Sequence, residues 1–303
     1  MSFVAESLPG QTFGFGRHET FPFRYGWLKK AVDGVSTDPE LFRRPDAIVI
    51  LGVGKNMVSS IRHWGLASRV LVESSRHSLS VSPLGSALFQ RWDPYMEDPA
   101  SLWLIHYLIV TNAHRAGTWN IAFTRLVRPD FSKHELLTAI TEHVQRAGQR
   151  ASQATLKRDL EVFVRTYCPS AIDSKSLEDS FDCPLVELGL LSRFADSDSF
   201  RFNIGPKRTL PTEILAFCLG AYTSVVASGR RSVSVHECLY GPGSPGQVFK
   251  LDENAVMQYL EDLESVTDGA LVVDDTAGLK QVYQRQSVDF VQLLDSYYSA
   301  FSR

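Results

Sequence analysis

The chain has 303 residues, of which 44% are hydrophobic and 21% charged, and its formal net charge is −3. This composition is typical of a soluble globular protein of one to three domains and excludes a disordered or collagen-like chain. No apolar run is long enough for a membrane-spanning helix, and the N-terminus lacks a secretory signal pattern. The four cysteines form no CxxC pair, so neither a disulfide framework nor a zinc site is indicated. We expect a cytoplasmic protein that does not enter a membrane.

The charge is distributed unevenly along the chain. Residues 17–92 contain 11 Lys and Arg against 6 Asp and Glu, whereas residues 252–303 contain 3 against 10. A basic front is suited to binding a polyanion such as DNA, and an acidic end is suited to a protein partner or to solvent. The two ends of the chain are therefore expected to have different partners.

The first block of the chain is predicted to consist of helices followed by a short hairpin. The expected elements are helices over 25–35 and 55–67 and strands over 70–73 and 79–82. A second short helix precedes the turn Gly52-Val53-Gly54. This order is typical of a winged helix-turn-helix, so residues 1–92 are predicted to form an N-terminal winged-helix DNA-binding domain.

The helix predicted over 55–67 has two different faces. Met57, Ile61 and Trp64 recur at the spacing of one apolar face, and polar residues recur on the opposite side. The residues of this block predicted to contact DNA are Arg24, Lys29, Lys30, Lys55, Asn56, Ser59, Arg62 and His63, with Arg76 and His77 at the hairpin tip. The alternative is an ordinary solvated helix face without a ligand.

Three carboxylates follow the first block, at the start of a predicted helical connector over residues 93–130. Asp93, Glu97 and Asp98 lie within six residues, and Mg²⁺ prefers carboxylate oxygens together with a substrate phosphate. We assign all three as candidate catalytic residues, with Asp93 and Glu97 as metal ligands. The structural alternative is that Asp98 caps a helix that begins at Pro99.

The rest of the chain is predicted to repeat the order of helices and hairpin twice. Residues 131–208 read as a second winged-helix-like domain, in which Lys157 and Arg158 could contact DNA. A protein-docking role for this domain is an equal alternative. Residues 209–303 read as an acidic, winged-helix-like interaction domain, suited to a partner or a homodimer interface. The fold class predicted is mainly α with small β-hairpin wings, arranged as tandem winged helix-turn-helix modules.

Three motifs resemble the SspB-like proteins of bacterial DNA-phosphorothioation cassettes. They are HETFPFRYGWLKK at 18–30, LGVGKNMVSSIRHW at 51–64, and DPYMEDP at 93–99 with LWL at 102–104. The likeness covers about the first 120 residues and extends to the remainder only in helical character. This resemblance implies a role in a defence system that places sulfur on the DNA backbone. It also implies partners, namely a desulfurase, an ATPase and an ATP pyrophosphatase-like sulfurtransferase.

The leading hypothesis joins the residue patterns to this resemblance. The protein would bind DNA through its first block and nick one strand, with Mg²⁺ held by the carboxylates named above. Two alternatives keep the same DNA-binding block. The protein could be a non-catalytic adaptor that positions modification enzymes, or a transcriptional regulator of the cassette.

Overall fold

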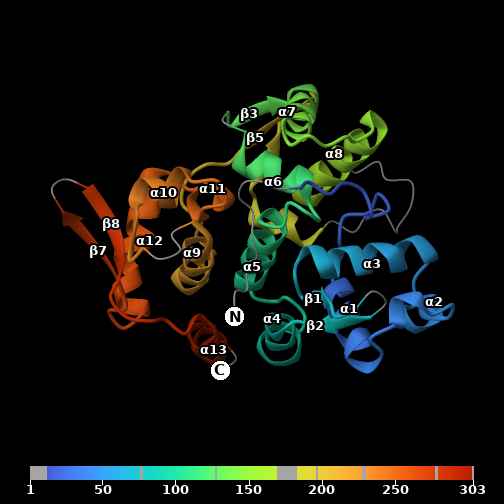
Figure 1. Cartoon of the computed structure of the whole chain (residues 1–303), viewed down its shortest axis with the longest axis horizontal. Helices are drawn as coiled ribbons and strands as arrows, with labels where there is room; N and C mark the ends of the chain where they lie inside the picture. The colour runs from blue at the N-terminus through green and yellow to red at the C-terminus, as the bar shows by residue number, and fades with distance from the viewer. Residues whose placement is uncertain are drawn as a thin grey trace.

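Helices make up most of the protein (Figure 1). The computed structural model describes residues 12–75, 78–126, 128–168, 183–195, 197–226, 230–276 and 279–301. The helices up to residue 124 are α1 (Trp27–Thr37), α2 (Ala47–Leu51), α3 (Lys55–Ala67), α4 (Pro83–Ala87), α5 (Pro99–Val110) and α6 (Gly117–Thr124). The later helices are α7 (Lys133–Arg146), α8 (Gln153–Tyr167), α9 (Thr212–Val226), α10 (Val235–Tyr240), α11 (Pro245–Phe249), α12 (Glu253–Val266) and α13 (Phe290–Phe301). Three shorter helical segments are η1 (Leu41–Arg43), η2 (Leu88–Trp92) and η4 (Pro184–Leu188).

The strands form three small antiparallel sheets in the described residues. The first sheet is a hairpin of β1 (Leu71–Glu73) and β2 (Leu79–Val81), in which Leu71 pairs with Val81. The second contains β3 (Asp130–Ser132), β4 (Leu191–Arg193) and β5 (Ser199–Phe202), in the order β3-β5-β4. The third contains β6 (Ser232–Ser234), β7 (Leu271–Thr276) and β8 (Leu279–Gln284), in the order β6-β8-β7. The second and third sheets therefore share one topology, in which a strand before the helices pairs with the last strand of the hairpin.

Most of the predicted helix boundaries are confirmed, because their capping signals are local. Ser132 and Glu135 form a capping box at the start of α7. Asp98 caps α5 by accepting a hydrogen bond from the backbone N–H of Ala100, and Pro99 occupies the first helical position. The mainly helical fold class with small hairpins is thus confirmed. The assignment of the three blocks to winged helix-turn-helix modules stays a prediction.

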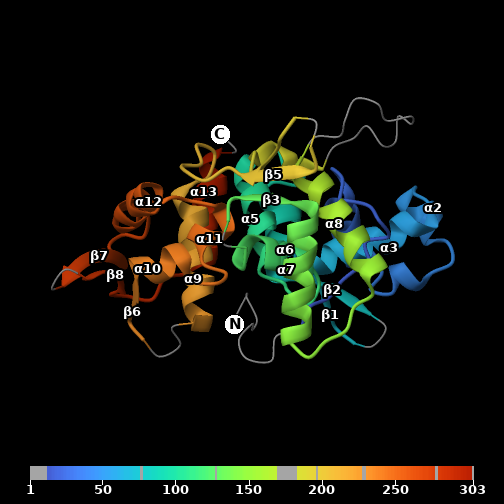
Figure 2. The same ribbon diagram turned by 90° about the horizontal axis from the view of Figure 1, so that it is seen from above.

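Helix α5 is the centre of the hydrophobic core, as Figures 1 and 2 show. Every residue from Ala100 to Val110 is buried, so this helix is covered on all sides. His106 donates from Nε2 to the carbonyl of Val248 at 2.9 Å and accepts at Nδ1 from the hydroxyl of Tyr167 at 2.8 Å. It is a core histidine whose two ring nitrogens are both hydrogen-bonded. The core is one connected cluster that includes residues from Phe23 to Tyr298.

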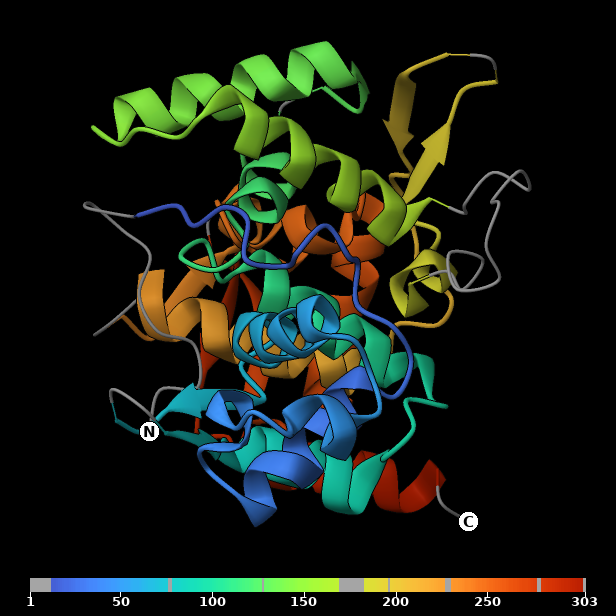
Figure 3. The same cartoon turned by 90° about the vertical axis from the view of Figure 1, so that its right-hand side faces the viewer.

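An extended segment over residues 12–24, here called the N-terminal strap, runs between α3 and α8 (Figure 3). The backbone N–H of Gly14 donates to Ala113 at 2.9 Å, and the N–H of Gly117 donates back to Gly14. A Cβ atom on Gly14 would lie 1.9 Å from the carbonyl oxygen of His114, so only glycine permits this approach. The strap therefore connects the first block to the connector and to α8.

The helices do not have the properties of membrane spans. Within the described residues, none combines the length and the apolar character needed to cross a bilayer.

Candidate nucleic-acid interface

Helix α3 presents the two faces that its spacing predicts. Ile61 and Trp64 are fully buried, and the indole N–H of Trp64 donates to the carbonyl of Phe21 at 3.0 Å. Lys55 and Asn56, at the N-terminal end, are exposed. The first turn of a helix also offers backbone N–H groups and a positive dipole end. This end of α3 is therefore free to approach an anion.

Three other cations of the first block are engaged within the molecule. Lys29 donates to the carboxylate of Asp33 at 2.5 Å, and Lys30 donates to the carbonyl of Leu51 at 2.8 Å. The guanidinium of Arg24 lies 5.7 Å from the ring centroid of Phe21 and 5.6 Å from that of Trp27. Their predicted DNA contacts would compete with these interactions. Arg76 and His77 lie outside the described residues.

Helix α8 adds exposed cations across the N-terminal strap from α3 (Figures 2 and 3). Lys157 and Arg158 are both exposed. Within the described part of the chain, neither they nor Lys55 forms an ion pair, and Ser59 of α3 is also exposed. Unpaired surface cations on two neighbouring helices provide the electrostatic footprint that a phosphate backbone requires.

The strap between these helices has a strained backbone. Arg17, Glu19 and Thr20 have φ values of 67°, 48° and 65°, in the left-handed region that side chains rarely adopt. This conformation turns Arg17 and Glu19 outward and buries His18 between them. Such strain persists only where surrounding contacts hold it, and it is concentrated at functional sites.

The contacts that hold the strap centre on Asp159 of α8. Its carboxylate accepts from Nε2 of His18 at 2.8 Å, from the N–H of Gly16 at 2.5 Å and from the hydroxyl of Thr118 at 3.0 Å. The N–H of Thr20 donates to Nδ1 of His18, so the imidazole carries its proton on Nε2. Because each polar group in this buried set has a partner, it fixes the strap against α8.

A pocket of about 290 Å³ opens beside α3, and we call it the arginine pocket. Among its described lining residues are Arg17 of the strap, Arg62 of α3 and Arg115 of the loop before α6. The carboxylate of Glu73 bridges two of these, accepting from Arg62 at 3.3 Å and from Arg115 at 2.9 Å. Partial burial opposes ionisation of Glu73, but Arg115 and Arg62 together hold its pKa below the ordinary value. Glu19 also lines the pocket.

His63 lies at the floor of the arginine pocket, which corrects one expectation. Its ring is only 4% exposed, so it does not belong to the exposed face of α3. Both ring nitrogens are buried and lack a hydrogen-bond partner within the described residues. Burial lowers the pKa of His63 well below its ordinary value, and the positive charges of Arg115, Arg17 and Arg62 lower it further. The imidazole is therefore neutral at pH 7.

The carboxylates that follow the first block organise a turn. Asp93 accepts from the N–H groups of Glu97 and Asp98 and, at 2.6 Å, from the hydroxyl of Ser101. Asp98 caps α5, while Glu97 is exposed. Because Asp93 holds the turn, Asp98 caps α5 and Glu97 is exposed, the three carboxylates do not converge on one magnesium ion in this arrangement. The described residues also contain no group of three or more His, Cys, Asp or Glu side chains placed to hold a metal. Their catalytic assignment stays a prediction.

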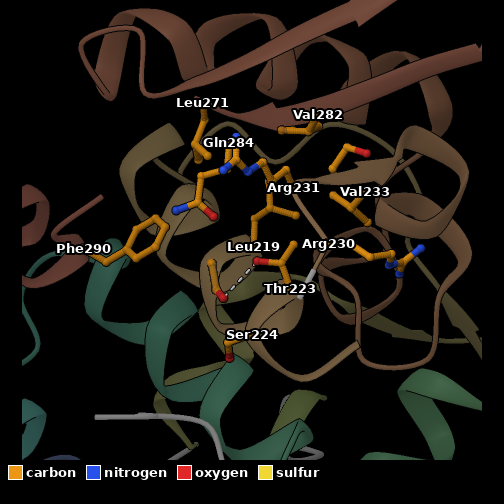
Figure 4. A pocket seen from close by; sticks show the side chains of 12 residues that line it. Leu219, Thr223, Ser224, Arg230, Arg231, Val233, Leu271, Val282, Gln284 and Phe290 are labelled. Carbon is orange, nitrogen blue, oxygen red and sulfur yellow. Dashed lines mark hydrogen bonds between the residues drawn. The ribbon is translucent and has the colours of Figure 1, made fainter. Parts of the chain in front are cut away.

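A second pocket, of about 360 Å³, lies in the third block (Figure 4). Leu219, Leu271 and Phe290 supply apolar surface, whereas Arg231 and Gln284 supply polar groups. None of the residues predicted from the sequence to contact DNA or a metal lines it.

Sequence reasoning missed Arg17 and Arg115, which line the arginine pocket, and Glu73, which bridges two of its arginines. They are separated by up to 98 positions in the chain. Each stands outside the periodic pattern of a helix face, so spacing carries no signal for them. The dipeptide His18-Glu19 within the first motif was the nearest local indication.

Comparisons with known proteins agree over almost the whole chain. The family model described as "Protein of unknown function (DUF4007)" matches residues 15–298. An SspB crystal structure is 29% identical with a TM-score of 0.85, and the match covers 94% of this chain and 88% of the other. A magnesium ion-bound SspB crystal structure is 30% identical with the same TM-score and coverage. A search of curated proteins finds no match. The chain therefore belongs to the DUF4007 family and is SspB-like in both sequence and fold.

Proposed function

We propose that this protein is the DNA-binding component of a DNA-phosphorothioation system and that it nicks one strand of the duplex. The observation that carries the DNA-binding part is the surface formed by the N-terminal half of α3, the arginine pocket beside it and the exposed cations of α8. The SspB-like fold supports the association with phosphorothioation. In such a system the partners would be a desulfurase, an ATPase and an ATP pyrophosphatase-like sulfurtransferase.

The side chains on this surface have distinct tasks in the proposed complex. Lys55, Lys157 and Arg158 would neutralise backbone phosphates along the duplex, which sets affinity and its dependence on salt. Asn56 and Ser59 can donate and accept hydrogen bonds at base edges or phosphates. The binding would therefore be mostly electrostatic and would weaken as salt is raised.

Nicking breaks one phosphodiester bond, and negative charge develops on the phosphate oxygens in the transition state. Guanidinium groups stabilise such charge when they are already in position. Arg17, Arg62 and Arg115 all line the arginine pocket. Mg²⁺ belongs in the assay, because one SspB relative is described as magnesium ion-bound.

The deciding experiment is relaxation of a supercoiled plasmid by highly purified protein, with Mg²⁺ and with EDTA. We expect an open-circular product that depends on Mg²⁺ and duplex binding that persists in EDTA. Asp93→Ala and Glu97→Ala test the predicted carboxylates. If both variants remain folded and nick like the wild type, those carboxylates are not part of the mechanism.

A non-catalytic DNA-binding adaptor is the second candidate. It is favoured by the hydrogen bonds of Asp93, which give this carboxylate a structural task in holding the turn before α5. An adaptor would bind duplex DNA with the same residues and leave the plasmid supercoiled under every metal condition. A regulator of the cassette would instead protect a specific site upstream of its own operon in footprinting.

A further inference from the structure

The arginine pocket holds more positive charge than its internal partners neutralise. Arg62 and Arg115 share the single carboxylate of Glu73, and Arg17 has no ion-pair partner among the described residues. Glu19 is a carboxylate that lines the pocket itself. The Arg115 side chain is only 12% exposed, so its charge is largely withdrawn from water and needs an anion nearby.

His63, which lines the pocket, also lacks a hydrogen-bond partner among the described residues. Both nitrogens of His63 are buried and unpaired in the described structure, although the residue lines the pocket. Buried polar atoms of folded proteins are almost always hydrogen-bonded, and an exception calls for a ligand or an ordered water. A neutral imidazole that lines the same pocket as three guanidinium groups is suited to donate a hydrogen bond to an anion bound there.

Glu73 has the properties of a replaceable partner. It is the last residue of β1, next to the hairpin tip, and its side chain is 49% exposed. Its oxygens bind two guanidinium groups as the oxygens of a phosphate would, and exposed ion pairs of this kind cost little to break. The Glu73 carboxylate can therefore turn toward solvent once another anion takes its place beside the largely buried Arg115.

We propose that the arginine pocket binds a phosphate group, which takes the place of the Glu73 carboxylate between Arg62 and Arg115 and approaches His63. Arg17 supplies the third cation at the mouth. Glu73 thus acts as an internal competitor that lowers the affinity of the pocket for the ligand. The site rests on the pocket itself, and only the identity of the ligand as a phosphodiester of DNA rests on the proposed function.

Binding of inorganic phosphate to the full chain, measured by calorimetry, tests the site directly. Glu73→Gln removes the competitor, and we expect phosphate to bind about fivefold more tightly. Glu40→Gln is the matched control, since Glu40 is exposed and pairs with Arg43 at 3.9 Å outside the pocket. Arg17→Ala, an exposed change that leaves the core intact, should weaken binding by a similar factor.

The outcomes separate this inference from the proposed function. Equal phosphate affinity in Glu73→Gln and Glu40→Gln, or unchanged affinity in Arg17→Ala, would overturn the site even if duplex DNA still bound. Phosphate binding that responds to all three variants as expected, together with no binding of a duplex, would support the site and reject the DNA role. If phosphate and a duplex compete for the protein, and Glu73→Gln tightens the binding of each, the phosphate site and the DNA-binding role are both supported.

Discussion

Helices α3 and α12 take the same place in their blocks, each directly before a hairpin, but they carry opposite charge. Lys55 and Arg62 are the charged residues of α3, whereas α12 has four exposed carboxylates and no Lys or Arg. The acidic residues of α12 are Glu253, Glu261, Asp262 and Glu264. The two helices lie at opposite ends of the molecule (Figure 1).

This difference shows that the same order of helix and hairpin can carry a basic surface in one block and an acidic surface in another. Each helix buries an apolar face, through Ile61 and Trp64 in α3 and through Leu260 and Leu263 in α12. The outward residues take no part in that packing and are free to vary. The similar element order of the two blocks therefore does not indicate which ligand each block binds. The charge on the outward face of the helix decides which block can approach DNA.

The largest expected effect comes from removing the anchor of α3. Trp64→Ala deletes a fully buried indole and its hydrogen bond to Phe21, and should lower the free energy of unfolding by about 3–5 kcal/mol. Leu263→Ala in α12 makes the parallel change and should cost about 2–5 kcal/mol. Urea unfolding of both variants measures the two values. A loss below about 1 kcal/mol for Trp64→Ala would mean that α3 is not held by its apolar face.

Acid should weaken the first block through His63. Its pKa is lowered in the folded state, so unfolding takes up a proton once the pH falls below the ordinary histidine value of 6.5. Stability is then present above pH 6.5 and is lost below it, by about 1.4 kcal/mol per pH unit for each such histidine. His106, with a pKa lowered to about 3 by burial, adds an equal slope.

His63→Leu separates these two contributions. The variant should retain the His106 slope and lose that of His63, so its stability between pH 6.5 and 5.5 should fall by about half as much as that of the wild type. Urea unfolding at several pH values provides the measurement. An unchanged slope would show that His63 is protonated in the folded protein.

Neutralising the exposed cations of α3 should weaken DNA binding. For Lys55→Ala with Arg62→Ala we expect about tenfold lower affinity for a duplex, and a salt dependence whose log–log slope is shallower by about 2. Fluorescence anisotropy across a salt series gives both quantities. Lys280→Ala, an exposed cation of β8 in the third block, is the control and should behave like the wild type. Equal affinity and slope in the double variant would remove this face from the interface.

The smallest effect is expected from the acidic helix. Glu261→Gln with Glu264→Gln should change duplex affinity by less than about twofold, because charges separated by more than a Debye length of about 8 Å are screened at physiological salt. The same anisotropy assay applies. A larger gain in affinity would indicate that DNA also contacts the third block. The charge difference between α3 and α12 would then not separate a DNA-binding block from one that does not bind DNA.

Most of the secondary structure could be predicted because its causes are local. The bounds of α3, α7 and α12 follow from caps and apolar spacing within each segment. Strands β3 and β6 were not predicted, because neither has a hairpin partner next to it in the sequence to mark it as a strand. These two strands form only because β5 and β8 provide partners from far along the chain.

The residues of the candidate site likewise fall into those that local sequence predicts and those that only tertiary packing brings together. Residue order alone determined that α3 would expose Lys55, Asn56, Ser59 and Arg62, because helix geometry places them opposite the apolar face. Only the tertiary structure decided that Arg17 and Arg115 join Arg62 around one pocket, and that His63 closes its floor. Packing brings these side chains together although they lie far apart in the sequence. The spacing of residues along a single helix therefore cannot predict that they are close.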